Sequence, residues 1–482
     1  MRSFTSLITS GIKTYQVRLS EELRLLQLLG FTDLNVKNAS TVFSNEDKCA
    51  TKAHTELCIL DTIAVCLISG EQDNVIAAAL DKRENITLIL AKNRHVVPED
   101  TVRVSDFMSA VEGAELWDDV LPFLTKYSKE QLDKRIAHLR LSMFQHSEWL
   151  AAEARGYQFS SALETEFPEA SVYLEASYPE AQPPWTPLRI ILDVIQVCFK
   201  ECDGFEMQSN ELSYVRFYRL YGAANTLRNS AFLAHIVQDP RRAWRIEKLK
   251  RRLGKICQYS RIDLLIKQVR KGGVYPFRWI EMTSRGTGEG RHTLCNSPQD
   301  VVARVWKNPP GKQPAPSSKT VETHPNLTNW DEKLVVDTHI HAELRIILHL
   351  SRPFLSGSQK PSDMQLPIGC SKRSCLCCML WMESFNKIVG THWMTGGSHG
   401  KPYDAWALPG TAGDTLDAKW REFDVAVING VHERVVKHVE MLLTTKPRTN
   451  SDDLASSGSE LGDPLEEARR ARARKHWLPR TT

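Results

Sequence analysis

The spacing of hydrophobic and polar positions changes along the chain, and these changes separate helices from strands. Residues 15–48 and 52–68 carry apolar side chains at helical spacing, whereas 73–93 holds two apolar runs rich in β-branched residues around a charged turn. A spacing near 3.6 residues predicts helices, and paired β-branched runs around a polar turn predict a β-hairpin. We therefore expect two helical segments followed by a hairpin.

Helical spacing returns over residues 115–275 without a repeat of fixed length, so a helical solenoid is not supported. The next segment, 307–326, reads "KNPPGKQPAPSSKTVETHPN" and has no apolar period. Such Pro-, Lys- and Ser-rich composition is typical of a mobile linker. The residues between hairpin and linker are thus predicted to form a mainly helical domain.

Beyond the linker, helical and extended patterns alternate. Helices are predicted at 341–351, 374–389 and 414–444, with short strands at "LPIGCS" and "GTHWMT" between them. This alternating order indicates a compact α/β layer. The tail, 446–482, is polar and then strongly basic, which predicts disorder.

The bulk composition allows two to three domains and excludes a polycation. The chain has 482 residues, of which 42% are hydrophobic and 25% charged, and its net charge is +4. Any interaction with nucleic acid must therefore depend on a local patch. The longest apolar stretch, "LCILDTIAVCLISG", contains Asp61 and is too short to span a bilayer. The first twenty residues lack Asp and Glu and weakly resemble a transit peptide.

Four of the eleven cysteines lie within nine positions, at Cys370, Cys375, Cys377 and Cys378. Their low overall density and this clustering favour a reducing compartment and a metal site over disulfides. We expect a cytoplasmic or nuclear protein, with the mitochondrion as a minor alternative. Cys377 is interpreted as a buried structural thiol, and Cys370 as the end of the preceding strand.

The strongest candidate site combines His341 and Glu343 with Cys375 and Cys378. Cysteines three positions apart share one helical face, and one imidazole with two thiolates leaves the open position that a catalytic zinc needs. Ser374 is the predicted N-cap, and a helix start favours thiolates. Glu343 is interpreted as the carboxylate that transfers protons. A structural zinc knuckle and plain buried thiols are the alternatives.

A second interpretation uses the same stretch, "VVDTHIHAELR". Asp337, His339 and His341 form the D-x-H-x-H pattern that opens metal-dependent amidohydrolase barrels. Such a barrel needs about 250 further residues, but only 141 of the 482 follow His341. His339 is therefore predicted to be a capping or surface histidine.

The H-A-E and C-x-x-C motifs resemble the signature of the cytidine deaminase-like superfamily. The segments "PIGCSKRSCLCC" and "GSHGKPYDAWALP" are similar to a sparsely characterised deaminase-like branch found widely in fungal proteins. The resemblance covers 330–445 and extends in part to 52–95. It implies a three-layer α/β/α sandwich with a mixed sheet, and hydrolytic, zinc-assisted loss of ammonia. The superfamily has Pro before its first zinc cysteine, where this chain has Ser374.

The superfamily core begins with a helix and a β-hairpin before the H-x-E helix, and here these parts are far apart in the sequence. We therefore expect a core split by a large, mainly helical insertion, which is tolerated when its two ends lie close together. The predicted units are an N-terminal helical segment (1–50), the first helix and hairpin of the core (51–98), the insertion (99–306), the linker (307–328), the zinc-binding core (329–445) and the tail (446–482).

Substrate contacts are predicted at two places. In better-known relatives an asparagine after the second strand contacts the substrate, and Asn93 matches it, although it can also simply turn the chain. In "GGSHGKPYDAW", Ser398, His399 and Trp406 are predicted to line a pocket, with a plain connecting loop as the alternative. Trp393 or Trp406 is a candidate for stacking on a base, although such residues often belong to the core.

Residues 241–271 contain twelve Lys and Arg against two acidic residues, with apolar positions on the opposite helical face. This predicts either a solvated surface or a patch that binds phosphates of nucleic acid. Nuclear import or an acidic protein partner are further uses of the same patch. The sequence as a whole favours a zinc-dependent deaminase acting on a nucleobase, free or in nucleic acid. The competing hypothesis is a zinc-stabilised scaffold without activity.

Overall fold

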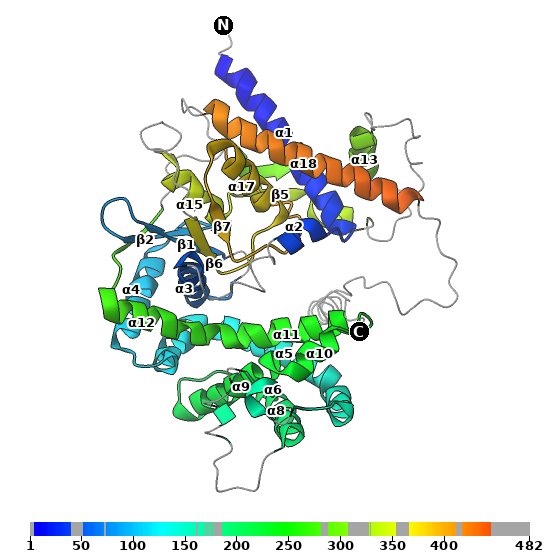
Figure 1. The fold of residues 1–482 in the computed structure, drawn as a ribbon. Coiled ribbons are helices and arrows are strands. Elements are labelled where there is room, and N and C mark those ends of the chain that lie inside the picture. The colour runs from blue at the N-terminus through cyan, green and yellow to red at the C-terminus, as the bar shows by residue number, and fades with distance from the viewer. Residues whose placement is uncertain are drawn as a thin grey trace, which may run out of the picture.

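The computed structural model describes residues 4–39, 52–71, 74–160, 186–280, 288–306, 329–352, 366–410 and 417–444, parts of 162–177, and residue 327 (Figure 1). The predicted linker at 307–326 and the predicted tail at 446–482 lie outside the described residues. None of the described helices is long and apolar enough to cross a membrane.

Five of the described strands form one mixed sheet in the order β3-β2-β1-β6-β7. Strand β1 is antiparallel to both β2 and β6, whereas the β2–β3 and β6–β7 pairs are parallel. The predicted hairpin therefore pairs directly with the strand that leads into the cysteine cluster, although nearly three hundred positions separate Ala77 from its partner Cys370. The strands are β1 (Ile76–Asp81), β2 (Thr87–Lys92), β3 (Phe277–Trp279), β6 (Leu366–Cys370) and β7 (Trp393–Thr395).

The two faces of this sheet bury alternate residues of the hairpin, as the period of two in a strand requires. Ala78 and Leu90 belong to the core shared with α3 (Lys52–Cys66) and the helical insertion. Ala77 and Ile89 belong to the core shared with α15 (Ala342–Leu350) and α17 (Leu376–Val389) on the other face. The expected α/β/α sandwich, split by a helical insertion, is thus confirmed.

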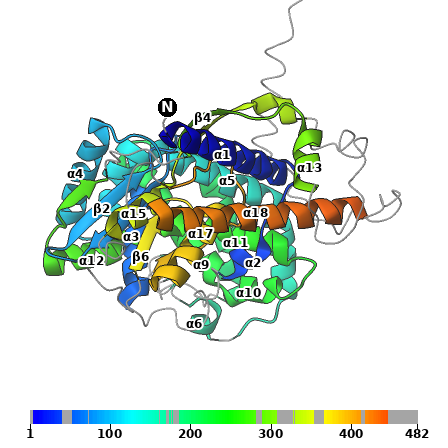
Figure 2. The same cartoon turned by 90° about the horizontal axis from the view of Figure 1, so that it is seen from above.

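The insertion lies on the α3 side of the sheet, and α1 (Phe4–Leu28) and α18 (Asp417–Thr444) lie side by side on the other (Figures 1 and 2). The chain returns from the insertion through β3, which adds to the edge of the sheet next to β2. The insertion contains α4 (Pro98–Gly113), η2 (Trp117–Val120), α5 (Leu121–Gly156), α6 (Leu163–Glu166), α8 (Pro187–Cys202), α9 (Glu211–Asn229), α10 (Ala231–Val237), α11 (Ala243–Cys257), η3 (Gln258–Arg261) and α12 (Ile262–Gly272).

Two features differ from the sequence-based expectation. The helical pattern over 15–48 is interrupted, since α1 ends at Leu28 and a short α2 follows. A strand, β5, immediately precedes His341 and pairs with β4, where only a linker was expected. Strands β4 and β5 are too short to show a clear alternation of apolar residues. They form because they pair with each other, which the local sequence does not show. The remaining elements are α1 (Phe4–Leu28), α2 (Leu34–Ala39), β4 (Gly290–Thr293), α13 (Pro298–Trp306), η4 (Trp330–Lys333), β5 (Val335–Thr338), α15 (Ala342–Leu350), α17 (Leu376–Val389) and α18 (Asp417–Thr444).

Helix α3 packs so closely on β6 that a side chain at Gly369 would overlap the backbone of Leu60 and Asp61. We expect Gly369→Ala to lower the free energy of unfolding by at least about 2 kcal/mol, because neither backbone can move without separating helix from sheet. Urea denaturation measures this change. Gly113→Ala is the control, since a Cβ there meets no atom within 4 Å. Equal stability of the two variants would contradict the close packing.

Candidate metal centre and active site

Two helices begin at the residues predicted to bind metal. His341 is the N-cap of α15, and Cys375 is the N-cap of α17. The Cys378 N–H donates to Cys375 Sγ at 3.4 Å, so a thiol caps the helix that carries it. The prediction that Ser374 is the N-cap was wrong by one residue. Its hydroxyl instead bonds to Thr395 Oγ1 on β7.

The His341 Nδ1 atom and the two sulfur atoms form a tight triangle. Nδ1 lies 3.6 Å from Cys375 Sγ and 3.3 Å from Cys378 Sγ, and the two sulfurs lie 3.5 Å apart. Tetrahedral zinc with Zn–S near 2.3 Å and Zn–N near 2.0–2.1 Å places such atoms about 3.6–3.8 Å apart. Both cysteines are buried, at 2% and 1% exposure. The residues present therefore fit a zinc ion with one position left open.

The thiols differ in acidity although all are buried. Burial raises the pKa of Cys375, but hydrogen bonds from Cys377 and Cys378 and the charge of His341 outweigh it and hold that pKa well below its usual range. Burial, together with the neighbouring Cys375, raises the pKa of Cys377 and of Cys378. Cys375 is thus the most acidic of the three thiols, and a bound cation would favour loss of the protons from both Cys375 and Cys378.

Trp406 lies behind the cluster and not in an open pocket. Its ring is fully buried, and Nε1 donates to Cys378 Sγ at 3.3 Å. N–H donors of this kind orient a metal ligand and stabilise its negative charge. Because Trp393 is also buried, neither tryptophan has an exposed ring face on which a base could stack.

Glu343 lies in the first turn of α15, two residues after His341, and is only 4% exposed. Its charge contributes to the raised pKa of Cys378 and of Cys370. The carboxylate therefore lies close enough to the cluster for its charge to act on a ligand. A buried carboxylate beside an open metal position has the placement that proton transfer requires.

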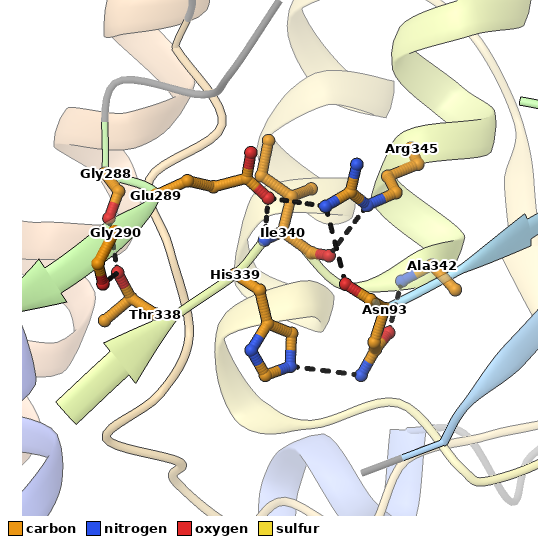
Figure 3. A network of polar contacts seen from close by, with 9 residues as sticks. All are labelled: Asn93, Gly288, Glu289, Gly290, Thr338, His339, Ile340, Ala342 and Arg345. Atoms are coloured by element: carbon orange, nitrogen blue, oxygen red, sulfur yellow. Dashed lines mark hydrogen bonds and ion pairs between the residues drawn. The ribbon is translucent and has the colours of Figure 1, made fainter. Parts of the chain in front are cut away.

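Asn93 follows β2 and reaches the start of α15. Its Oδ1 accepts a hydrogen bond from the Ala342 N–H at 2.8 Å, and its Nδ2 lies 3.3 Å from His339 Nε2 (Figure 3). The N-cap residue His341 makes no side-chain capping bond of its own, so Asn93 supplies the cap from a distant strand. Both ends of its amide are occupied, which places it as a positioning residue beside the metal cluster.

We expect Asn93→Ala to lower the free energy of unfolding by about 1–3 kcal/mol, since it removes a buried cap and leaves the Ala342 N–H without it. Urea denaturation of the full chain measures the effect. Asn85→Ala, in the exposed hairpin turn, serves as the control and should change stability by less than about 0.5 kcal/mol. No difference between the two would show that the cap is dispensable.

An ion pair between Glu289 and Arg345, which the sequence did not reveal, also holds the backbone at the start of α15. Glu289 Oε1 accepts hydrogen bonds from the Ile340 N–H at 2.9 Å and from Arg345 Nη2 at 2.5 Å (Figure 3). Arg345 Nε also donates to the Ile340 carbonyl at 3.1 Å. Glu289 was missed because no apolar period surrounds it, and its partner lies 56 positions away.

His339 lies beside the metal cluster, and the expectation of a surface or capping histidine needs correction. Its side chain is half-buried, and its ring centroid lies 5.5 Å from that of His341. Among the described residues, however, the group of potential metal ligands contains His341 and the two cysteines and not His339. The structure therefore supports one histidine ligand.

The loop after β7 packs against the start of α17. Ser398 is buried, and its hydroxyl donates to the Ser374 carbonyl at 2.9 Å and accepts from the Gly400 N–H. Burial lowers the pKa of His399, although the charge of Cys375 opposes this effect. Tyr403, which the sequence did not single out, lies against both histidines, with ring centroids 5.4 Å from His399 and 6.4 Å from His341. Tyr403 is 38% exposed, whereas Trp393 and Trp406 are buried.

The structure combines a split α/β/α sandwich with one histidine and two cysteines at two helix N-termini. Residues 340–410 match the family described as OTT_1508_deam:-like deaminase. This segment contains His341, Glu343 and both cysteines of the triangle, and the resemblance to the deaminase-like superfamily is confirmed. Neither the curated proteins nor the solved structures include a significant match.

Proposed function

We propose that this protein is a zinc-dependent deaminase that replaces the amino group of a nucleobase by oxygen. The observation that carries the proposal is the triangle of His341, Cys375 and Cys378 with Glu343 in the adjacent first turn. Its occurrence within a segment that matches a deaminase family supports the same reaction class.

The three donor atoms would bind a metal ion and leave its fourth coordination position open. Zinc bound in this way lowers the pKa of a water molecule to about 7 and so supplies a nucleophile at neutral pH. The positive ends of α15 and α17 converge on the cluster and favour the thiolate forms of Cys375 and Cys378. The Trp406 N–H stabilises the charge on Cys378.

Glu343 performs the proton transfers in this proposal. Its carboxylate would accept one proton from the water and deliver it to the ring nitrogen while the water oxygen bonds to the ring carbon that carries the amino group. Glu343 would then transfer the remaining hydroxyl proton to the departing amine. The C–N bond breaks, a carbonyl remains on the base, and ammonia leaves. Because Glu343 is 4% exposed, the proton passes to the substrate in preference to bulk solvent.

The side chains around the opening suit a flat heterocycle. Tyr403 is partly exposed and can stack on a base, and His399 Nδ1 accepts a hydrogen bond from the Lys401 N–H at 3.1 Å, which leaves Nε2 of His399 to donate to an acceptor on the base. A base within a polymer would have to be unpaired or flipped to reach this depth.

The test is ammonia release by the zinc-loaded full chain with cytidine, adenosine, guanine, and single-stranded DNA and RNA. We expect release from at least one of these by the wild type and none by Glu343→Ala. Zinc binding without release from any substrate would support the scaffold alternative. A protein that binds no zinc would overturn the proposed metal centre.

A further inference from the structure

A pocket of about 200 Å³ lies where the helical insertion meets the deaminase-like core. On one side it is lined by α11 of the insertion. On the other side it is lined by the residues that follow β6 and β7, including Ser371 and Gly397. We call this cavity the interdomain pocket. It exists only because the insertion folds back against the ends of the two strands that lead to the metal site.

The insertion contributes five cationic side chains to the interdomain pocket, namely Arg228, Lys250, Arg251, Lys255 and Arg261. Three of them come from α11, which carries the densest part of the basic stretch noted in the sequence. Other cations of that stretch, such as Lys267, are exposed elsewhere on α12. The structure thus divides the basic stretch into a pocket-lining part and a solvated part.

The core adds Lys372 and Arg373, and Asp61 is the one acidic residue among the described residues that line the pocket. Asp61 Oδ1 already accepts a hydrogen bond from the Cys370 N–H at 2.8 Å. In the described part of the chain, no carboxylate lies within ion-pair distance of Arg251 or Arg373. One carboxylate against seven Lys and Arg gives the lining of the pocket an excess of basic residues.

This excess of like charge costs stability unless an anion offsets it. Burial, together with the charges of Arg135 and Arg373, lowers the pKa of Lys255 to about 7. Guanidinium and ammonium groups converging on one concave site have the chemistry that binds phosphate oxygens.

The pocket is joined to the metal centre by backbone hydrogen bonds. The Ser374 N–H donates to the Gly397 carbonyl at 3.1 Å, and the His399 N–H donates to the Ser374 carbonyl at 3.2 Å. Ser374 directly precedes Cys375 in the chain. A ligand in the pocket therefore lies on the loops that also hold a metal ligand and the proposed base-facing His399.

We propose that the interdomain pocket binds a phosphate group of the substrate whose base reaches the metal centre. This inference rests on the proposed function and restricts its substrate class to phosphorylated nucleosides over free bases and nucleosides. The phosphate belongs either to a mononucleotide or to a phosphodiester of a single strand. The helical insertion then has a direct part in substrate recognition, because α11 supplies cations of the pocket.

The experiment compares two charge-matched double variants of the full chain, Lys250→Gln with Arg251→Gln and Lys267→Gln with Lys271→Gln. Only the first pair lines the pocket, whereas Lys267 and Lys271 are exposed on α12. Calorimetry measures binding of nucleoside 5′-monophosphates and the matching nucleosides, and fluorescence anisotropy measures binding of a labelled single-stranded 12-mer. Thermal melting and zinc content verify that both variants are folded.

We expect the wild type and the Lys267/Lys271 variant to bind at least one phosphorylated probe more tightly than its nucleoside. The Lys250/Arg251 variant should lose at least about tenfold of this preference. Mononucleotide binding identifies a free nucleotide. Binding of the 12-mer alone identifies a polymer, and the slope of log K against log salt should then fall by about 1.4 in the pocket variant.

Equal losses in both variants, or no preference for phosphate in the wild type, would overturn the proposal. All binding is repeated in the Glu343→Ala background, where no turnover can consume the probe. A protein that binds phosphorylated probes without releasing ammonia would retain the pocket assignment while the proposed reaction fails. Release of ammonia without a preference for phosphorylated probes would support the proposed reaction and contradict the pocket assignment.

Discussion

Glu343→Gln is expected to reduce ammonia release by about 10²–10⁴-fold while leaving the zinc content at one ion per chain. Gln fills nearly the same volume but cannot accept and return a proton at neutral pH, and general acid–base catalysis contributes a factor of this size. Glu343 is not among the three residues that form the metal triangle, so its loss should not release the ion. Steady-state ammonia assays and metal analysis of one preparation measure both quantities.

Glu383→Gln provides the matched control for Glu343→Gln. Glu383 lies on α17 with an exposed side chain, outside the metal triangle. We expect its activity to remain within about twofold of the wild type, since surface substitutions of this kind have small effects. Full activity of Glu343→Gln would remove Glu343 from the mechanism. Loss of zinc from that variant would instead assign it a role in metal binding.

Cys375→Ser and Cys378→Ser are each expected to lower the bound zinc to less than about a tenth of an ion per chain, whereas Cys377→Ser should retain it. The three thiols are equally buried, but only the first two meet His341 Nδ1. A serine hydroxyl is a poor zinc ligand because it stays protonated at neutral pH, whereas a coordinated thiol does not. Metal analysis after gel filtration measures the zinc content.

The same variants separate metal binding from folding. Zinc that binds only the native state stabilises it by mass action, so a chelator should lower the melting temperature of the wild type and of Cys377→Ser. It should leave the two ligand variants unchanged, because they have no ion to lose. Retention of zinc by all three variants would contradict the assigned ligands, as would selective loss in Cys377→Ser.

The spacing of residues along the chain was sufficient to predict several helices, the hairpin and the motifs of the candidate metal site. The helix that became α3, the hairpin of β1 and β2, and the helices α15 and α17 have apolar periods long enough to be recognised without a structure. The pair Cys375 and Cys378 was recognised from its spacing because one helical turn places both on one face. The start of α15 was equally visible, which brought His341 and Glu343 into the same first turn.

Residues that depend on contacts between distant segments could not be found in this way. Glu289 pairs with Arg345 across 56 positions, and Trp406 donates to Cys378 from the loop after β7. Neither contact leaves a periodic pattern. Asn93 was singled out by resemblance as a substrate contact, but its bonds place it as the cap of α15. Tyr403 carries no motif and is conspicuous only because its exposed ring lies near His341.

The sequence by itself therefore determined the elements of a split deaminase-like core and the residues of its candidate metal site. Apolar periodicity and the spacing of the candidate ligands are local properties, so the sequence alone shows them. Only the tertiary structure decided which side chains position those ligands and where a positive pocket forms beside them. Both depend on the docking of the insertion and loops onto the sheet, where burial and like-charge proximity arise between residues that no local pattern connects.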